Sequence, residues 1–219
     1  MGEKAKARVV IVDDHPIMRL GLTQLLRSSP RVEVCGEAGS VGEALKVIES
    51  VSPVDLVVID ISLPDRSGLE LIRDLKVMDG KIRSLVVSSH DEKVYAERVI
   101  RAGGRGYIMK DRAPEQLIEA VDAVLGGGIF LSHAMTARMM ETLAGARAGS
   151  PISALTDREL EVFRAIGEGK SSREIAGILG ISIRTVDAHR THIKEKLGLR
   201  DAAELSYEAI RWMESQSKG

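Results

Sequence analysis

Hydrophobic positions follow two alternating periods in the first 128 residues. Short apolar runs of strand length are each followed by a segment with apolar residues at helical spacing. The five runs are Arg8 to Val12, Val32 to Glu37, Val54 to Ile59, Ser84 to Ser88 and Arg105 to Met109. Strands and helices that alternate at these loop lengths predict right-handed parallel crossovers. The pattern therefore predicts an α/β fold with a doubly wound, five-stranded parallel sheet.

The period changes after residue 152, where only helical spacing is found. Thr156 and Glu159 have the spacing of a capping box, as do Ser40 and Glu43 in the first half. Helices are predicted from Ser172 to Leu179 and from Ile183 to Leu197, separated by a three-residue turn that contains Gly180. This arrangement is typical of a helix-turn-helix, whose second helix enters the major groove of DNA. Asp201 is predicted to begin a further helix.

These patterns predict two domains joined by a linker. Residues 1–128 form the α/β domain, residues 129–152 the linker, and residues 153–219 an all-α helix-turn-helix domain. In the linker a helix is predicted from Ala134 to Ala144, followed by a flexible tether at Gly145, Gly149 and Pro151.

Composition limits the class of protein. The 219 residues carry a formal net charge of −1, so any contact with nucleic acid has to come from a local basic patch. Cys35 is the single cysteine, which excludes a disulfide within the chain and favours a reducing compartment. No apolar run approaches the roughly 18 residues of a membrane span, and the N-terminus lacks the apolar stretch of a secretory signal. We expect a soluble, cytoplasmic protein without a membrane partner.

Polar residues follow four of the five predicted strands. Asp13 and Asp14 follow the first, Asp60 the third, Ser88 the fourth and Lys110 the fifth. The carboxyl ends of parallel strands meet at one edge of the sheet, so these side chains are expected to share a crevice. Three adjacent carboxylates repel one another unless a cation neutralises them, and an all-oxygen site suits Mg²⁺. A carboxylate beside Mg²⁺ and a lysine is a plausible phosphoryl acceptor.

These residues resemble the receiver domain of bacterial response regulators in the NarL/FixJ branch. The motifs that carry the resemblance are Asp13-Asp14-His15-Pro16, Asp60 with Pro64 and Gly68, Ser88, and Gly106-Tyr107-Ile108-Met109-Lys110. The resemblance implies a flavodoxin-like receiver in which Asp60 accepts phosphate from a histidine kinase. It also implies that Mg²⁺ is held by Asp13, Asp14, Asp60 and the backbone carbonyl of Ser62. Lys110 would pair with the phosphate, Ser88 would move its hydroxyl onto a phosphate oxygen, and Tyr107 would change its burial in step.

Each of these residues also has a purely structural interpretation. Asp13 and Asp14 could cap a helix, Lys110 could be a solvated loop residue, and Tyr107 could be a core aromatic. Ser89 adjoins Ser88, so a shift of one residue would exchange their roles. His15 and His90 are expected near the site, with a surface role favoured over a metal role.

An enzyme of the haloacid-dehalogenase kind is an alternative for the first domain. Such phosphatases also use a strand-end aspartate with Mg²⁺. They share a second aspartate two positions later, which serves as the acid and base. That position is Ser62 here. We therefore favour a receiver that catalyses only its own phosphorylation and dephosphorylation.

Charge supports DNA binding by one helix of the second domain. Residues 153–219 contain 11 basic and 11 acidic residues, whereas Ser182 to Arg200 contains five basic and two acidic residues, a local excess of three. Arg190 and Lys194, four residues apart, suit phosphate contact. The candidates for reaching base edges are Arg184, Thr185, Asp187, Ala188 and Thr191. A solvated amphipathic helix is the alternative that charge alone leaves open.

The same segment resembles the LuxR-type helix-turn-helix. The matching positions are Leu155-Thr156, Arg158-Glu159, Glu161-Val162, Glu174-Ile175-Ala176, Ile181-Ser182, Thr185-Val186, His189 and Lys196-Leu197-Gly198. The resemblance adds His189 and Lys196 to the predicted DNA-binding set. It implies a phosphorylation-dependent transcription regulator that binds double-stranded DNA, with a homodimer formed on phosphorylation or on DNA binding.

Asp187 departs from this resemblance, because many relatives have a lysine there. It could accept a hydrogen bond from a cytosine amino group, or pair with Arg184 or Arg190 on the helix surface. A helix-turn-helix that has lost DNA binding and regulates protein partners is the remaining alternative.

Overall fold

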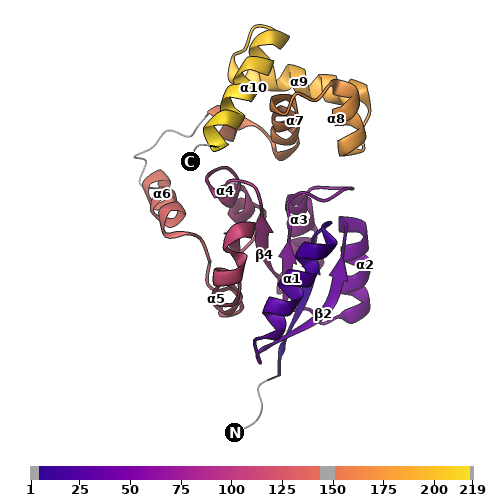
Figure 1. The fold of residues 1–219 in the computed structure, drawn as a ribbon, viewed down its shortest axis with the longest axis vertical. Coiled ribbons are helices and arrows are strands. Elements are labelled where there is room, and N and C mark those ends of the chain that lie inside the picture. Colours follow the sequence, from indigo (N-terminus) through magenta and orange to yellow (C-terminus); the bar gives the residue numbers. More distant parts are fainter. Residues whose placement is uncertain (1–4, 144–150, 218–219) are drawn as a thin grey trace. The chain divides into compact units, whose positions relative to one another are not determined.

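Five parallel strands form one sheet in the first half of the chain, in the order β2-β1-β3-β4-β5 (Figure 1). The strands are β1 (Ala7–Val12), β2 (Val32–Ala38), β3 (Leu56–Ile59), β4 (Arg83–Ser88) and β5 (Gly106–Met109). In the register of the three inner strands, Ile11 lies beside Val58 and Val58 beside Leu85. The strand order reverses at β1, with β2 on one side of it and β3 on the other. The predicted doubly wound sheet is confirmed.

Helices cover both faces of this sheet. They are α1 (Pro16–Arg27), α2 (Val41–Val51), α3 (Gly68–Met78), α4 (Glu92–Ala102) and α5 (Ala113–Leu125). On one face α1 packs against α5, and Ile11 and Val58 are buried beneath them with Leu22 and Val121. The neighbouring Val57 points to the opposite face and is equally buried, as expected for a strand covered on both sides.

The computed structural model describes residues 5–143 and 151–217. Two compact units are distinguished, Met1–Met140 and Glu141–Gly219. The division falls within α6 (His133–Leu143), which begins inside the predicted linker. Gly145 and Gly149 of the predicted tether lie outside the described residues, and Pro151, its third residue, begins the 3-10 turn η2 (Pro151–Ala154). No helix in the two described ranges combines the length and the apolar character that a membrane span requires.

Strand β3 is shorter than the apolar run that predicted it. The run begins at Val54, but the strand spans Leu56–Ile59. The carboxylate of Asp55 accepts a hydrogen bond from the backbone N–H of Arg8 at 2.8 Å. At the other end the backbone N–H of Asp60 donates to the carbonyl of Val12. Asp60 is thus held at the edge of the sheet by β3, which it follows, and by the end of the neighbouring strand β1.

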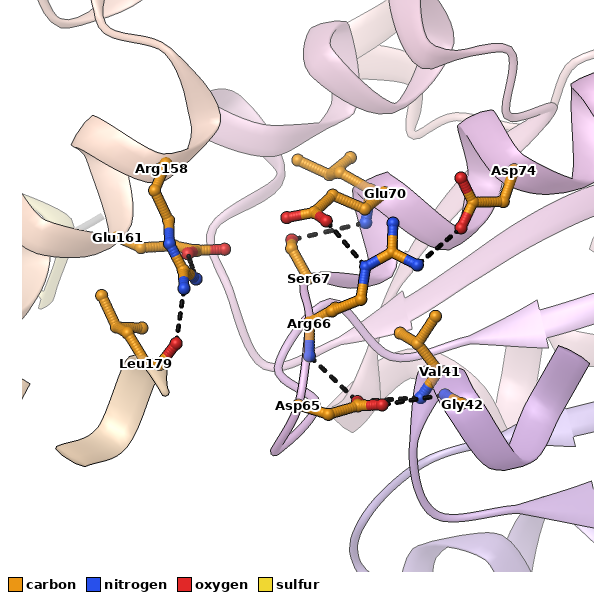
Figure 2. Close-up of polar contacts among 11 residues, drawn as sticks. Val41, Gly42, Asp65, Arg66, Ser67, Glu70, Asp74, Arg158, Glu161 and Leu179 are labelled. Carbon is orange, nitrogen blue, oxygen red and sulfur yellow. Dashed lines mark hydrogen bonds and ion pairs between the residues drawn. The ribbon is translucent and has the colours of Figure 1, made fainter. Parts of the chain in front are cut away.

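Of the two hydrogen bonds of the capping box predicted at the start of α2, one is present and the other is wrong. The Ser40 hydroxyl accepts the N–H of Glu43, but Glu43 Oε2 accepts the N–H of Gly39, at 2.6 Å, instead of that of Ser40. The first free N–H groups of α2 are satisfied by Asp65, whose carboxylate accepts from Val41 at 2.9 Å and from Gly42 at 2.8 Å (Figure 2). The loop that follows β3 is therefore fixed to the start of α2.

The second unit consists of helices α7 (Asp157–Gly167), α8 (Ser172–Leu179), α9 (Ile183–Leu197) and α10 (Ala202–Ser217), preceded by a short 3-10 turn, η2 (Pro151–Ala154). The capping box predicted for Thr156 and Glu159 is present in both halves. Helix α7 packs against α9 and α10, which buries Phe163 and Ile193. Between α8 and α9 the chain turns at Gly180, whose φ of 62° favours glycine. The predicted helix-turn-helix is confirmed.

Substitution of Gly68 by alanine is expected to destabilise the first unit by about 1–3 kcal/mol, as overpacking does. A Cβ at Gly68 would lie 2.2 Å from the carbonyl oxygen of Asp60 and 2.9 Å from Ile59 Cγ2. Calorimetric unfolding of the full chain would measure the loss. Fluorescence of the single tryptophan, Trp212, identifies the transition of the second unit.

Gly21→Ala provides the matched control. Gly21 lies inside α1, and a Cβ there would meet nothing within 4 Å. Alanine at this position is expected to raise stability by up to about 1 kcal/mol through helix propensity. Equal effects of the two substitutions would contradict the proposed contact with the Asp60 carbonyl.

Candidate functional site

A lysine and two buried aspartates meet at the carboxyl edge of the sheet. Asp13 follows β1, Asp60 follows β3, and Lys110 is the first residue after β5. Lys110 Nζ lies 2.7 Å from Asp13 Oδ2 and 2.8 Å from Asp60 Oδ2. The side chains of Asp13 and Asp60 are only 1% and 4% exposed, respectively. One ammonium group therefore bridges two carboxylates that water scarcely reaches.

Asp14 and His15 complete an acidic cluster at this edge. One potential ligand atom from each of Asp13, Asp14, His15 and Asp60 lies within 4.8 Å of all the others. His15 Nδ1 is 2.6 Å from Asp14 Oδ1, and its backbone N–H donates to Asp13 Oδ1 at 2.8 Å. The structure thus gathers the three predicted carboxylates and adds an imidazole beside them.

Ser88 lies on the buried side of the neighbouring strand end. It is the last residue of β4 and is 1% exposed, whereas Ser89 is exposed. This difference distinguishes the two adjacent serines, which the sequence could not separate. The Ser88 hydroxyl accepts the N–H of His90 at 3.4 Å. Tyr107, which is fully buried, donates its hydroxyl to the carbonyl of His90 at 2.7 Å.

The loop after Asp60 is held by contacts on both sides. Ser62 lies two residues beyond Asp60, and its hydroxyl is 2.7 Å from His90 Nε2. Arg66 pairs with Glu70 at 2.9 Å and with Asp74 at 2.7 Å, both on α3 (Figure 2). Coordination of a metal ion by the backbone carbonyl of Ser62 stays a prediction.

Helix α9 presents most of the predicted DNA-binding residues on its open surface. Val186 and Ile193 are fully buried and fix the inner face of the helix. The exposed candidates are Arg184, Thr185, Asp187, Ala188 and Thr191, and the half-buried ones are His189, Arg190 and Lys194. The outward face therefore combines cationic, hydroxyl and small side chains with the carboxylate of Asp187 along a single helix.

Two family comparisons match the two parts of the chain. Residues 9–122 match the response regulator receiver domain, and residues 153–209 match the bacterial regulatory proteins of the luxR family. The nitrate/nitrite response regulator protein NarL of Escherichia coli is 33% identical over 208 residues, which are 93% of this chain and 95% of NarL. The chain is a NarL/FixJ-family response regulator.

Solved structures of a relative agree with this assignment. The RcsB response regulator of Salmonella typhimurium is 25% identical, with a TM-score of 0.71 over 95% of this chain and 98% of RcsB. RcsB bound to promoter rprA in the presence of phosphomimetic BeF3⁻ gives a TM-score of 0.67, again at 25% identity, over 92% of this chain and 97% of RcsB. The response regulator thus combines a receiver with a LuxR-type DNA-binding domain and belongs to a family of DNA-binding transcription regulators.

Burial controls the electrostatics of the receiver site. Burial raises the pKa of Asp60 above its ordinary value of 3.8. Lys110 and the hydroxyl of Ser88 oppose this shift, and the nearby charge of Asp13 adds to it. Burial lowers the pKa of Lys110, but Asp13 and Asp60 outweigh burial and the pKa is raised above 10.5. Lys110 therefore stays protonated. Asp60 Oδ1 is buried without a hydrogen-bond partner, so the receiver holds an unsatisfied acceptor where negative charge has collected.

Lys196 differs from the other predicted DNA contacts. Its Nζ lies 2.6 Å from Oε2 of Glu159, which is almost fully buried at the start of α7. Asp187 is also engaged, because its carboxylate accepts the hydroxyl of Ser172 at 3.0 Å. Arg158 pairs with Glu161 and donates to the carbonyl of Leu179 at the end of α8 (Figure 2). These contacts fasten the two helices of the helix-turn-helix to α7 and to each other.

Sequence reasoning did not find the roles of Asp65 and Glu159. Asp65 holds the α2 terminus 24 residues away, and Glu159 binds a lysine 37 residues further along the chain. Capping patterns are local, and they revealed only the contacts of Glu159 within its own first turn. Glu159 is buried at the start of α7, and its charge is balanced by Lys196 on α9. A sequence pattern does not indicate which distant cation fills this role.

Replacing Glu159 by glutamine is expected to destabilise the DNA-binding domain by about 1–2 kcal/mol near neutral pH. Burial raises the pKa of Glu159, but Lys196 and the N–H of Thr156 outweigh it, and the pKa is lowered from 4.5. A carboxyl group with a lowered folded-state pKa stabilises the fold above its unfolded-state pKa, and this stability is lost as the pH falls through the folded-state value. The difference between wild type and variant should therefore vanish in acid.

Thermal unfolding followed by Trp212 fluorescence at a series of pH values would measure this effect. Trp212 lies 5.6 Å from Phe163 between ring centroids, so it reports the packing of α10 on α7. Glu195→Gln, an exposed position on α9, serves as the control and should change the midpoint little. A destabilisation that persists unchanged below the lowered folded-state pKa of Glu159 would exclude the ion pair as its cause.

Proposed function

We propose that phosphorylation of Asp60 by a histidine kinase switches this response regulator between a resting form and a DNA-binding form. The observation that carries the proposal is the buried carboxylate of Asp60, which has one oxygen held by Lys110 and the other without a partner. A group that is fixed in place and has a free lone pair is suited to act as a nucleophile. Lys110 supplies positive charge at the position where phosphoryl charge would develop.

In this proposal a carboxylate oxygen of Asp60 attacks phosphorus, and the bond from phosphorus to the kinase histidine nitrogen breaks. Lys110 then pairs with the phosphoryl oxygens, and Ser88 turns its hydroxyl onto one of them. Tyr107, whose hydroxyl now binds the carbonyl of His90, changes its burial as Ser88 moves. The receiver catalyses its own phosphorylation and dephosphorylation, and Ser62 stands where a phosphatase of the haloacid-dehalogenase kind would have its second acid.

Mg²⁺ fits the acidic cluster of this site. Three of the four clustered residues, Asp13, Asp14 and Asp60, offer carboxylate oxygens, and His15 offers a ring nitrogen. Asp60 Oδ1 has no hydrogen-bond partner that a metal ion would have to displace. The ion would be held by Asp13, Asp14, Asp60 and the backbone carbonyl of Ser62. When bound, it would supply Lewis-acid neutralisation of phosphoryl charge.

Helix α9 is proposed to enter the major groove of double-stranded DNA. Arg184, Thr185, Asp187, Ala188 and Thr191 would face base edges, whereas His189, Arg190 and Lys194 would lie nearer the phosphates. Lys196, also predicted to contact DNA, would have to leave its ion pair with Glu159 to reach a phosphate. The DNA-bound RcsB relative supports this assignment. We propose that phosphorylation or DNA binding produces a homodimer on two half-sites and that the regulator works in the cytoplasm.

Asp60→Asn is expected to abolish phosphoryl incorporation from a small phosphodonor with Mg²⁺, because the amide is a far weaker nucleophile than the carboxylate. Intact-protein mass spectrometry would measure incorporation, and a gel shift on a genomic fragment selected by the wild type would measure DNA affinity. Asp79→Asn, at the end of α3, is the control, since asparagine can still accept the N–H of Lys81. Equal responses of the wild type and Asp60→Asn to the phosphodonor would exclude Asp60 as the switch.

Arg190→Ala and Lys194→Ala are each expected to weaken binding to all DNA sequences alike. Loss of one phosphate contact should reduce the slope of log affinity against log salt by about 0.9. Arg184→Ala should instead weaken the selected fragment by about 1–3 kcal/mol more than unrelated DNA, because it is assigned to base edges. Fluorescence anisotropy at several salt concentrations would separate the two effects. Lys46→Ala, exposed on α2 of the receiver, is the control and should leave the slope unchanged.

A further inference from the structure

The segment that leaves the receiver is bonded to the two elements that carry the proposed switch. After α5, Phe130 pairs with β5: its carbonyl accepts the N–H of Tyr107 at 2.9 Å, and its N–H donates to the carbonyl of Arg105 at 2.9 Å. Two residues later, the N–H of Ser132 donates to Glu92 Oε1 at 2.8 Å. Residues 130–132 therefore contact both β5 and the first turn of α4.

Ser132 is also the residue from which helix α6 begins. Its hydroxyl accepts the N–H of Met135 at 3.1 Å, and its carbonyl accepts the N–H of Thr136 at 2.9 Å. This is the geometry of a helix N-cap. Glu92 thus holds the N-cap residue of the linker helix, and the contact is partly buried, where a hydrogen bond to a charged group counts for more than at an open surface.

Glu92 is separated from the phosphoryl-acceptor site by one short loop. Ser88 ends β4, His90 donates its N–H to Ser88, and the carbonyl of His90 accepts the hydroxyl of Tyr107. Asp91 then caps α4 by accepting the N–H of Lys93 at 2.8 Å, and Glu92 is the first residue of that helix. A displacement of the Ser88 and His90 backbone has a short path to Glu92, because only Ser89, His90 and Asp91 lie between Ser88 and Glu92 in the chain.

We propose that the hydrogen bond from Ser132 N–H to Glu92 is a latch that holds the start of α6 in the resting state and opens on phosphorylation. The inference rests on the proposed function, in which Ser88 moves towards phosphoryl-Asp60. That movement draws the loop from Ser88 to Glu92 with it and lengthens a bond that already lies near its optimal distance. Opening the latch frees the start of the helix that leads to the DNA-binding domain.

Amide hydrogen exchange of Ser132 tests the latch in the wild type without any substitution. The N–H should be protected at rest and should exchange about tenfold faster after addition of Mg²⁺ and beryllofluoride. The amide of Phe130, which is bonded to Arg105, provides an internal comparison within the same segment. Unchanged protection of Ser132 under conditions in which beryllofluoride binds would overturn the proposal.

Substitutions at Glu92 separate the latch from a simple effect on α4. Glu92→Ala removes the acceptor, so Ser132 should exchange about tenfold faster at rest, and resting DNA affinity should rise about fivefold towards the activated value. Glu92→Gln keeps an acceptor oxygen but loses the charge, and it should stay close to wild type in both measurements. A role limited to charge at the α4 N-terminus predicts instead that glutamine and alanine behave alike.

Glu97→Ala is the matched control on the same helix. Glu97 pairs with Arg101 on the surface and should leave Ser132 exchange and resting DNA affinity unchanged. Phosphoryl incorporation at Asp60 should be the same in all four proteins. If beryllofluoride does not change the DNA affinity of the wild type, the proposed function is refuted. If the wild type responds but Glu92→Ala matches it in Ser132 exchange and in resting DNA affinity, only the latch is refuted.

Discussion

The shared ion pair of Lys110 with Asp13 and Asp60 is the constraint on which the receiver depends. Two carboxylates buried at one sheet edge repel each other, and one ammonium group cannot neutralise both. Burial, helped by the nearby charge of Asp13, raises the pKa of Asp60, and one oxygen of Asp60 has no hydrogen-bond partner. Such an arrangement costs stability, and apolar packing on both faces of the sheet offsets the cost. The rest of the fold keeps these charges in place.

The loop after β3 shows how that positioning is achieved. Gly68 allows α3 to begin against the Asp60 carbonyl, at a distance that any larger residue would prevent. Asp65 ties the middle of the loop to the start of α2, and Arg66 ties it to α3 (Figure 2). Asp60 is consequently anchored on both sides, and a change in its charge displaces neighbouring side chains more readily than its own backbone.

The sequence was sufficient for the sheet because strand-length apolar runs and glycine-marked helix ends are local signals. The grouping of Asp13, Asp60 and Lys110 also followed, since parallel strands place their carboxyl ends at one edge. Contacts of distant partners did not follow. The ion pair of Lys196 with Glu159 and the hydrogen bond of Ser132 with Glu92 produce no periodic pattern in the sequence, because each depends on how separate elements pack.

Charge accounting at the site explains why a phosphoryl group would have effects beyond Asp60. Phosphorylation replaces a carboxylate by a group of greater negative charge, and Lys110 is already shared between two acids. The added charge has to be met by a bound cation and by further hydrogen-bond donors. Ser88 is a buried hydroxyl at the end of the neighbouring strand β4, and the loop that follows it is bonded to Tyr107 through His90. A site that starts with too few donors thus recruits them from β4, and β4 leads directly into α4.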